Sequence, residues 1–476
     1  MTPPESSDPE TSIDDIRRAL AAAFDEAAKH HHEGRLPEAI KLYQQVLKRD
    51  PGHASSWINM GVALRTVGQV DAAVASLFRG VALKTDDPGA RSNLGNALRA
   101  AGRFGEAASH HLAAVDMAPG DGAFEYNLGL VRRDLGELDA ALTCFKNAEA
   151  KGYEKPDLHW DRALTRLLEG DMARGMADYE WRWQIADAKP RSFTEPVWTG
   201  ATLKSGALLV YAEQGFGDTL QFFRYLPLLK GKAPRIIFEC QAPLARLFRD
   251  SPLSEDIEII ARDDDPASIV PMPAFDAQIA LLSLPHVLGA ADTALPGAMP
   301  YLAPPPGSHT VNAPPGQLKI GLTWAGKPTH RNDRNRTTSL QTFMPLLDEP
   351  DMTFFSLQLG SPADEIDRLG AGALVHDLRP YLQDFSNTAA VLSQLDLVIC
   401  VDTSLAHLAG AMARPVWTLL PFTPDWRWRL ERTDTPWYPS MRLFRPGSPR
   451  DWTDVIGQVK NALADFKKTF AAAQKN

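Results

Sequence analysis

The chain has 476 residues, enough for two or three domains, and a formal net charge of −9. An acidic chain without a long Lys/Arg run has no electrostatic footprint for nucleic acid. No uninterrupted apolar stretch approaches the roughly 20 residues that a membrane helix needs, and the first residues (MTPPESSDPET) are unlike a signal peptide. We therefore expect a cytoplasmic protein without membrane insertion, whose three cysteines are buried thiols: Cys144, Cys240 and Cys400.

The N-terminal part of the chain repeats with a period of 34 residues. This period, with small residues at fixed positions, resembles tetratricopeptide repeats, which are stacked pairs of antiparallel helices. Small side chains let two helices approach closely, and the recurring glycine is expected to supply a positive φ between them. The three columns are Gly34, Gly68, Gly102, Gly136 and Gly170; Ala39, Ala73, Ala107, Ala141 and Gly175; and Gly61, Gly95, Gly129 and Ala163. We predict a disordered tail over residues 1–19 and a five-unit solenoid over residues 20–189, with units that begin at Leu20, Ala54, Pro88, Gly122 and Pro156.

A polar column accompanies the repeats. Asn59, Asn93 and Asn127 stand two positions before the third small-residue column, and Asp25 and Asp161 occupy the same phase in the outer units. A carboxamide offers a donor and an acceptor, which matches one peptide unit of an extended chain. We expect the three asparagines to form a ladder along the groove that binds a protein. The alternative is that they only cap or bridge neighbouring helices.

The pattern changes after residue 189. Residues 190–206 are rich in Pro, Gly, Ser and Thr and predict a linker. Short apolar runs then alternate with amphipathic stretches, which is typical of α/β domains with parallel strands. A Pro-rich break over residues 303–316 separates two groups of strands, so we predict one Rossmann-like domain at 207–308 and another at 309–476, with a cleft between them. The expected strands are Ala207–Ala212, Arg235–Glu239, Ile257–Ile260, Ala277–Ala280, Lys319–Trp324, Thr353–Leu357, Leu395–Val401 and Val416–Leu420.

A glycine turn follows the first of these strands. In Glu-Gln-Gly-Phe-Gly-Asp, Gly215 and Gly217 allow a tight turn, and Asp218 lies at the start of a helix. The helix dipole would keep this carboxylate ionised, so it could take a proton from a hydroxyl. The alternative is that Asp218 only caps the helix.

Two further motifs are expected to bind phosphate. One loop after the strand Lys319–Trp324 is basic, and the segment after Leu395–Val401 begins a helix whose free N–H groups suit phosphate oxygens. The alternatives are a surface basic loop and a core histidine. Aromatic residues in the loop 421–428 could stack on a base or sugar, or pack between domains. The predicted donor-binding residues are Lys327, His330, Arg334, Arg336, Gln358, Asp402, Thr403, Ser404 and His407.

With these motifs, the chain resembles bacterial tetratricopeptide-repeat glycosyltransferases whose catalytic half is similar to the heptosyltransferases. The resemblance implies a GT-B fold, with the nucleotide-sugar held mainly by the C-terminal Rossmann-like domain. It also implies that Asp218 is the catalytic base and that the Asp402-Thr403-Ser404 segment with His407 contacts donor phosphate and sugar. Ser404 stands where the family usually has Gly, so heptose is not implied. Some similar proteins glycosylate flagellin, and the similar O-GlcNAc transferases hold polypeptides on an asparagine ladder.

We therefore predict an α-solenoid followed by an α/β GT-B half, acting as a metal-independent, inverting glycosyltransferase without a cofactor. The predicted acceptor is Ser or Thr of a protein, with flagellin as one candidate. Two alternatives stay open: a protein-binding scaffold with a catalytically idle GT-B half, and a transferase whose acceptor is a glycan.

Overall fold

The structure is a computed structural model that describes residues 13–188, 190–262, 272–290, 295–305, 309–329 and 332–473. The chain forms two compact units, which are divided between Thr165 and Arg166. The division falls inside the fifth predicted repeat and precedes the predicted linker at 190–206. Each unit is described separately below.

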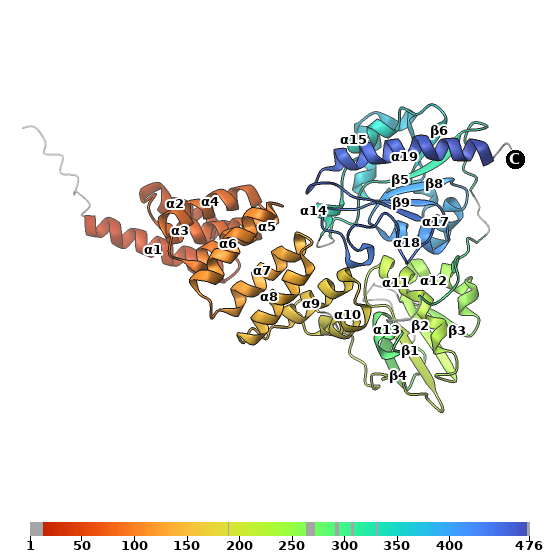
Figure 1. The fold of residues 1–476 in the computed structure, drawn as a ribbon, viewed down its shortest axis with the longest axis horizontal. Helices are drawn as coiled ribbons and strands as arrows, with labels where there is room; N and C mark the ends of the chain where they lie inside the picture. Colours follow the sequence, from red (N-terminus) through yellow and green to blue (C-terminus); the bar gives the residue numbers. More distant parts are fainter. Residues whose placement is uncertain are drawn as a thin grey trace, which may run out of the picture. The chain divides into compact units, whose positions relative to one another are not determined.

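The first unit is a stack of antiparallel helix pairs, as Figure 1 shows. Helix α1 starts at Ile13, earlier than the predicted start of the solenoid at Leu20, and residues 1–12 lie outside the described residues. The first helices of the next four pairs begin at the first residues of the predicted units. The helices are α1 (Ile13–His32), α2 (Leu36–Arg49), α3 (Ala54–Thr66), α4 (Val70–Leu83), α5 (Pro88–Ala100), α6 (Phe104–Met117), α7 (Gly122–Asp134), α8 (Leu138–Ala150), and α9 (Pro156–Glu169), which crosses into the second unit.

Close packing explains the small-residue columns. The recurring glycines have positive φ, for example 77° at Gly34 and 80° at Gly68, which confirms their expected role between helices. Ala73 is fully buried, as are its equivalents in the repeats on either side. A Cβ atom at Gly61 would lie only 2.5 Å from Cγ of Leu77, so a larger residue there would push the paired helices apart.

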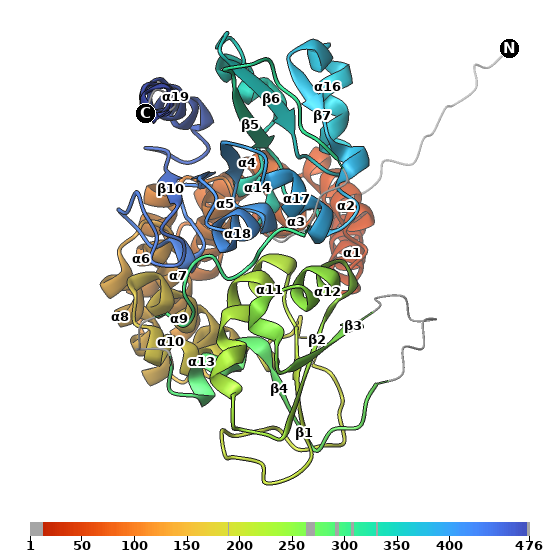
Figure 2. The same ribbon diagram turned by 90° about the vertical axis from the view of Figure 1, so that its right-hand side faces the viewer.

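The second unit begins with the end of the fifth repeat, helix α10 (Met172–Tyr179), and continues into two parallel sheets (Figures 1 and 2). The strand orders are β3-β2-β1-β4 and β10-β9-β8-β5-β6-β7. In the larger sheet the order reverses between β5 and β8, and such a switch point is where open α/β sheets bind ligands. The strands are β1 (Ala207–Tyr211), β2 (Arg235–Gln241), β3 (Ile257–Arg262), β4 (Ala277–Ala280), β5 (Leu318–Thr323), β6 (Met352–Ser356), β7 (Val375–Asp377), β8 (Leu397–Val401), β9 (Val416–Leu419) and β10 (Met441–Phe444).

Helices from the two sheet regions pack against each other. Helix α11 (Phe216–Phe222) contacts α18 (Ser404–Ala411), and α12 (Ala242–Arg249) contacts α17 (Phe385–Leu392), as Figure 2 shows. Both α11 and α18 follow a central strand, so this packing brings two carboxyl-terminal strand ends together. The long α19 (Trp452–Ala473) packs its apolar side chains into the hydrophobic core of the larger sheet.

The short helices of this unit are α13 (Leu284–Val287), α14 (Asp333–Arg336), α15 (Leu340–Phe343) and α16 (Glu365–Arg368). Among the described residues, none of the helices has the length and apolar character to cross a membrane. A helical repeat solenoid followed by two parallel α/β sheets confirms the predicted fold class.

Candidate functional site

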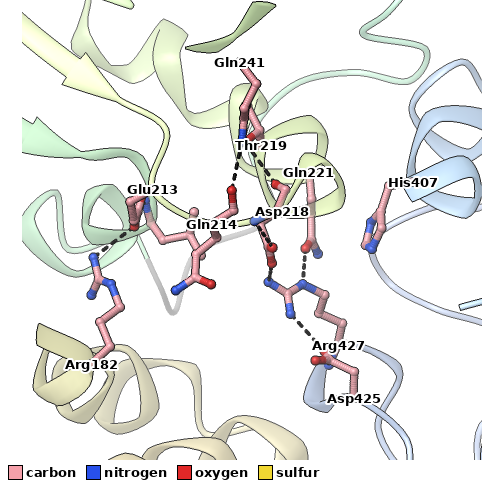
Figure 3. A network of polar contacts seen from close by, with 12 residues as sticks. Arg182, Glu213, Gln214, Asp218, Thr219, Gln221, Gln241, His407, Asp425 and Arg427 are labelled. Carbon is pink, nitrogen blue, oxygen red and sulfur yellow. Dashed lines mark hydrogen bonds and ion pairs between the residues drawn. The ribbon is translucent and has the colours of Figure 1, made fainter. Parts of the chain in front are cut away.

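Asp218 lies in the first turn of α11, directly after β1 (Figure 3). Its Oδ2 accepts a hydrogen bond of 2.9 Å from the backbone N–H of Gly215, which precedes the helix. The side chain is 24% exposed, so one edge of the carboxylate reaches solvent. Asp218 therefore serves as part of the helix cap, and this role leaves Oδ1 for a second partner.

That partner is Arg427, a residue that the sequence did not single out. Its guanidinium contacts Oδ1 of Asp218, Oε1 of Gln221 at 2.5 Å and Oδ1 of Asp425 at 2.9 Å (Figure 3). Burial favours the neutral form of Arg427, but the charges of Asp425 and Asp218 outweigh it and raise the pKa. The arginine therefore stays charged and joins the loop after β9 to the carboxylate after β1.

The aromatic residues beside Arg427 are packing residues. Trp426 and Trp428 are 4% and 0% exposed, and the guanidinium of Arg427 lies 4.3 Å from the ring centroid of Trp426. These contacts support the packing alternative for the loop 421–428 over stacking on a base. The feature of the sequence that could have identified Arg427 is its position between Trp426 and Trp428, in the loop that follows β9.

His407 also packs inside the unit. Its Nδ1 lies 3.0 Å from the hydroxyl of Tyr438, and its ring lies against Gly217, where a Cβ atom would come within 2.7 Å of Cδ2. Burial lowers the pKa of His407 well below the usual value, so the ring is neutral. The described contacts thus place His407 in the α11–α18 interface, and its predicted donor contact stays a prediction.

The start of α18 has unused hydrogen-bonding capacity. Thr403 stands at the N-cap, yet its hydroxyl does not cap the helix, and its buried Oγ1 has no hydrogen-bond partner among the described residues. Ser404 is the first helical residue, and neighbouring Asp402 has its pKa raised to about 6 by burial, with the charge of Asp425 adding to the effect. Free N–H groups and an unpaired hydroxyl at a helix start suit an anionic ligand.

The basic loop lies beside this helix start. Arg336 donates to the backbone carbonyl of Asp402 at 3.1 Å, which ties the loop after β5 to the loop after β8. Lys327 and Arg334 are exposed, and neither side chain has a hydrogen bond or an ion pair among the described residues. His330 lies outside the described residues.

Gln358 holds the base of that loop. Its side chain is almost fully buried and makes four hydrogen bonds, two from the N–H groups of Trp324 and Ala325 and two to the carbonyls of Ala325 and Leu359. All its hydrogen-bonding capacity is thus used within the protein. Gln358 positions the loop, and the contacts do not present it to a ligand.

Glu213 belongs to the same glycine turn but was not predicted as a site residue. Its Oε1 lies 3.1 Å from Nη2 of Arg182, and its buried Oε2 has no hydrogen-bond partner among the described residues. Burial raises the pKa of Glu213 to about 7, because its pairing with Arg182 offsets only part of the desolvation. Arg182 also donates to Ser283, which follows β4. The turn after α10 is therefore bound to the segments that follow β1 and β4.

The three groove asparagines have different surroundings. Asn127 donates to Oγ of Ser92 at 3.1 Å, and Asn59 interacts with the hydroxyl of Tyr43, which offsets part of the rise that burial causes in the pKa of Tyr43. Asn93 has no side-chain hydrogen bond among the described residues. Bridging between neighbouring helices therefore accounts for Asn59 and Asn127 but not for Asn93.

The second unit thus brings a carboxylate, buried guanidinium groups and an open helix start to the ends of β1, β5 and β8. Within the described part of the chain, no group of three His, Cys, Asp or Glu side chains is arranged to hold a metal ion.

Parts of both units match known protein families. Residues 373–448 match glycosyltransferase family 9 (heptosyltransferase), and residues 30–94, 67–122 and 126–190 match tetratricopeptide repeats. The glycosyltransferase match includes Asp402, His407 and Arg427, whereas Asp218 lies outside it.

Protein FlbA of Caulobacter vibrioides is 26% identical over 469 residues, which cover 90% of this chain and 70% of FlbA. A crystal structure of MamA is 22% identical over 33% of this chain and 91% of its own, with a TM-score of 0.30. A tetratricopeptide-repeat protein of Thermus thermophilus, TTC0263, is 22% identical over 35% of this chain and 91% of its own, with a TM-score of 0.32. By the family matches alone, the chain joins tetratricopeptide repeats to a region of glycosyltransferase family 9.

Proposed function

We propose that this chain, a tetratricopeptide-repeat protein with a glycosyltransferase family 9 region, transfers a sugar from a nucleotide-sugar to a Ser or Thr hydroxyl of a protein. The observation that carries the proposal is the position of Asp218. This partly exposed carboxylate stands at the end of β1, while α18 and the basic loop present anion-binding groups in the same unit. The repeats support a protein as the acceptor, and flagellin is one candidate.

In this proposal Asp218 is the general base. The N–H of Gly215 and the guanidinium of Arg427 bind its two oxygens and fix the orientation of the carboxylate. As the acceptor oxygen attacks the anomeric carbon, its proton passes to Asp218, and the bond from that carbon to the donor phosphate breaks. Attack opposite the leaving group inverts the configuration.

The departing phosphate would be stabilised by the protein's own donors. Lys327 and Arg334 supply charge, and the helix start at Thr403 supplies N–H groups and an unpaired hydroxyl. In this scheme Arg336 positions the loop, because its Nη1 already binds the carbonyl of Asp402. We propose that these groups act without a metal ion, so EDTA should leave transfer unchanged.

A second function has one observation in its favour. Both oxygens of Asp218 already have a partner in the protein, Gly215 and Arg427, which leaves less of the carboxylate open to an acceptor hydroxyl and favours a catalytically idle half with the repeats as the working part.

The test is transfer from a panel of UDP-, GDP-, CMP- and ADP-sugars to proteins of a lysate, followed by Asp218→Asn. This variant keeps the size of the side chain and an oxygen for the Gly215 N–H, but it cannot act as a base. We expect transfer to fall 10²- to 10⁴-fold while donor binding persists. The matched control is Asp256→Asn, because Asp256 is 67% exposed and pairs with Lys230 on the surface. An active Asp218→Asn variant would contradict the assignment of the base, and a wild-type protein that transfers no sugar would favour the scaffold.

A further inference from the structure

Three arginines occupy the same position in consecutive repeats. Arg65, Arg99 and Arg133 each lie in the last turn of the first helix of a pair, in α3, α5 and α7. These first helices contact one another along the stack. Two of the arginines bind an acid of the following repeat, Arg99 with Asp134 at 2.5 Å and Arg133 with Asp161 at 2.7 Å.

Arg65 lacks such a partner. The positions equivalent to Asp134 and Asp161 in the next repeat are Ala100 and Asn93, neither of which carries a charge. Among the described residues, the side chain of Arg65 makes no hydrogen bond or ion pair. Burial, and then the positive charge of Arg99, lower the pKa of Arg65, as expected for a cation without a counterion.

Asn93 lacks a partner for a related reason. Asp161, its equivalent two repeats later, accepts a hydrogen bond from the hydroxyl of Tyr126 at 2.6 Å in addition to the one from Arg133. The residue equivalent to Tyr126 beside Asn93 is Ile58, which is buried and has no polar side-chain atom. Arg65 and Asn93 thus take the positions of the Arg133–Asp161 ion pair, but the carboxylate is missing.

We propose that Arg65 and Asn93 bind the carboxylate of an acidic side chain of a polypeptide that lies extended on the solenoid. The guanidinium presents a planar pair of N–H donors that match a carboxylate, and the carboxamide adds a third donor. The entering Asp or Glu replaces the carboxylate that Asp161 supplies in the later repeat. The site stands on the first unit alone, and only the identification of the polypeptide as the acceptor rests on the proposed function.

The test uses the full chain and two labelled 15-residue peptides of Gly, Ser and Thr. One peptide has Asp at every third position, so that a carboxylate can reach Arg65 in any register, and the other has Asn at the same positions. We expect the Asp peptide to bind about tenfold more tightly in fluorescence anisotropy, because a hydrogen bond to a charged partner contributes at least that factor. Equal affinities, or no binding of either peptide, would overturn the proposal.

Two variants locate the site. Asn93→Asp rebuilds the ion pair of the later repeat inside the protein, so it should abolish the preference for Asp while the melting temperature stays the same or rises. Arg65→Gln should abolish the preference by removing the cation. The control Arg49→Ala removes an exposed arginine at the end of α2 and should keep the preference. A tenfold preference that survives both Asn93→Asp and Arg65→Gln would place the carboxylate elsewhere and overturn the assignment.

The peptide assay separates this site from the proposed activity, because anisotropy requires no transfer. Asp218→Asn should bind both peptides as the wild type does. If no nucleotide-sugar supports transfer but the Asp preference persists, the proposed function fails and the site stands. If transfer occurs without any Asp preference, the site fails and the proposed function stands.

Discussion

A Cβ atom at Gly217 would lie 2.7 Å from Cδ2 of His407, so the glycine turn after β1 can approach α18 only because residue 217 has no side chain. Both residues were predicted as parts of the site, on separate motifs. The structure adds that they are in direct contact.

Gly217→Ala should therefore destabilise the second unit. The added methyl group meets a buried ring that is held by Tyr438, and overpacking of this kind costs about 1–3 kcal/mol. Urea unfolding followed by tryptophan fluorescence measures the loss. The control is Gly457→Ala in α19, where a Cβ atom has open space and the change should stabilise by about 0.5–1 kcal/mol. Equal effects of the two substitutions would argue against the contact.

Arg427→Met should cost about 3–5 kcal/mol, because it leaves Asp218, Asp425 and Gln221 without their common donor. Arg427→Lys keeps the charge but not the planar fork, so it should recover only part of the stability. Chemical denaturation of both variants checks the order. If Met is tolerated as well as Lys, the charge of Arg427 does not hold this network together.

Gln358→Leu should act on the loop that Gln358 holds. The substitution leaves the buried N–H groups of Trp324 and Ala325 unpaired, at a cost of about 1–3 kcal/mol each. If the basic loop binds the donor, affinity for the nucleotide-sugar should fall as well, which isothermal titration can measure. Gln394→Leu is a useful comparison, because Gln394 makes similar backbone contacts to Val311 and His309. Gln394→Leu should lower the free energy of unfolding without lowering the affinity for the nucleotide-sugar.

Glu213 should make stability depend on pH. Its pKa is raised from 4.5 to about 7 in the folded state, so between these values the unfolded chain loses the proton first. Stability therefore falls as pH rises from about 4.5 to about 7, and above that range the loss due to Glu213 persists without changing further with pH. Glu213→Gln should flatten this part of the profile, measured as free energy of unfolding at pH 5 and pH 8. The raised pKa of Asp402 acts in the same direction, so Asp402→Asn provides an independent check.

The repeat architecture could be predicted almost residue by residue, because a 34-residue period repeats its constraint in every unit. The positive φ of Gly68 and the complete burial of Ala73 follow from that period alone. Strands were predicted where apolar runs were long, as at β8, and missed at β7 and β10. Strand β7 has only three residues, and β10 alternates buried residues with an exposed Arg442, so neither gives a continuous apolar signal.

The sequence could point to a site residue only where a short motif carried the signal. The turn around Asp218 is such a motif because of its glycine–carboxylate spacing, and the role of Asp218 stays a prediction. Arg427 was missed because its role depends on a carboxylate more than two hundred residues earlier in the chain, and no local pattern records that pairing. Gln358 was expected to bind the donor. Its side-chain amide instead makes four hydrogen bonds to backbone groups, which neither its residue type nor its position in the sequence indicates.

The division of the chain at Thr165, inside α9, constrains how such a protein can be shortened or recombined. Arg182 belongs to the fifth repeat by sequence but to the sheet-bearing unit by its bonds to Glu213 and Ser283. A truncation that starts the chain at residue 190 would remove Arg182, the cation that pairs with Glu213 after β1. Repeats before Gly122 contain neither Arg182 nor its partners, so we expect a change in repeat number there to leave this anchor in place.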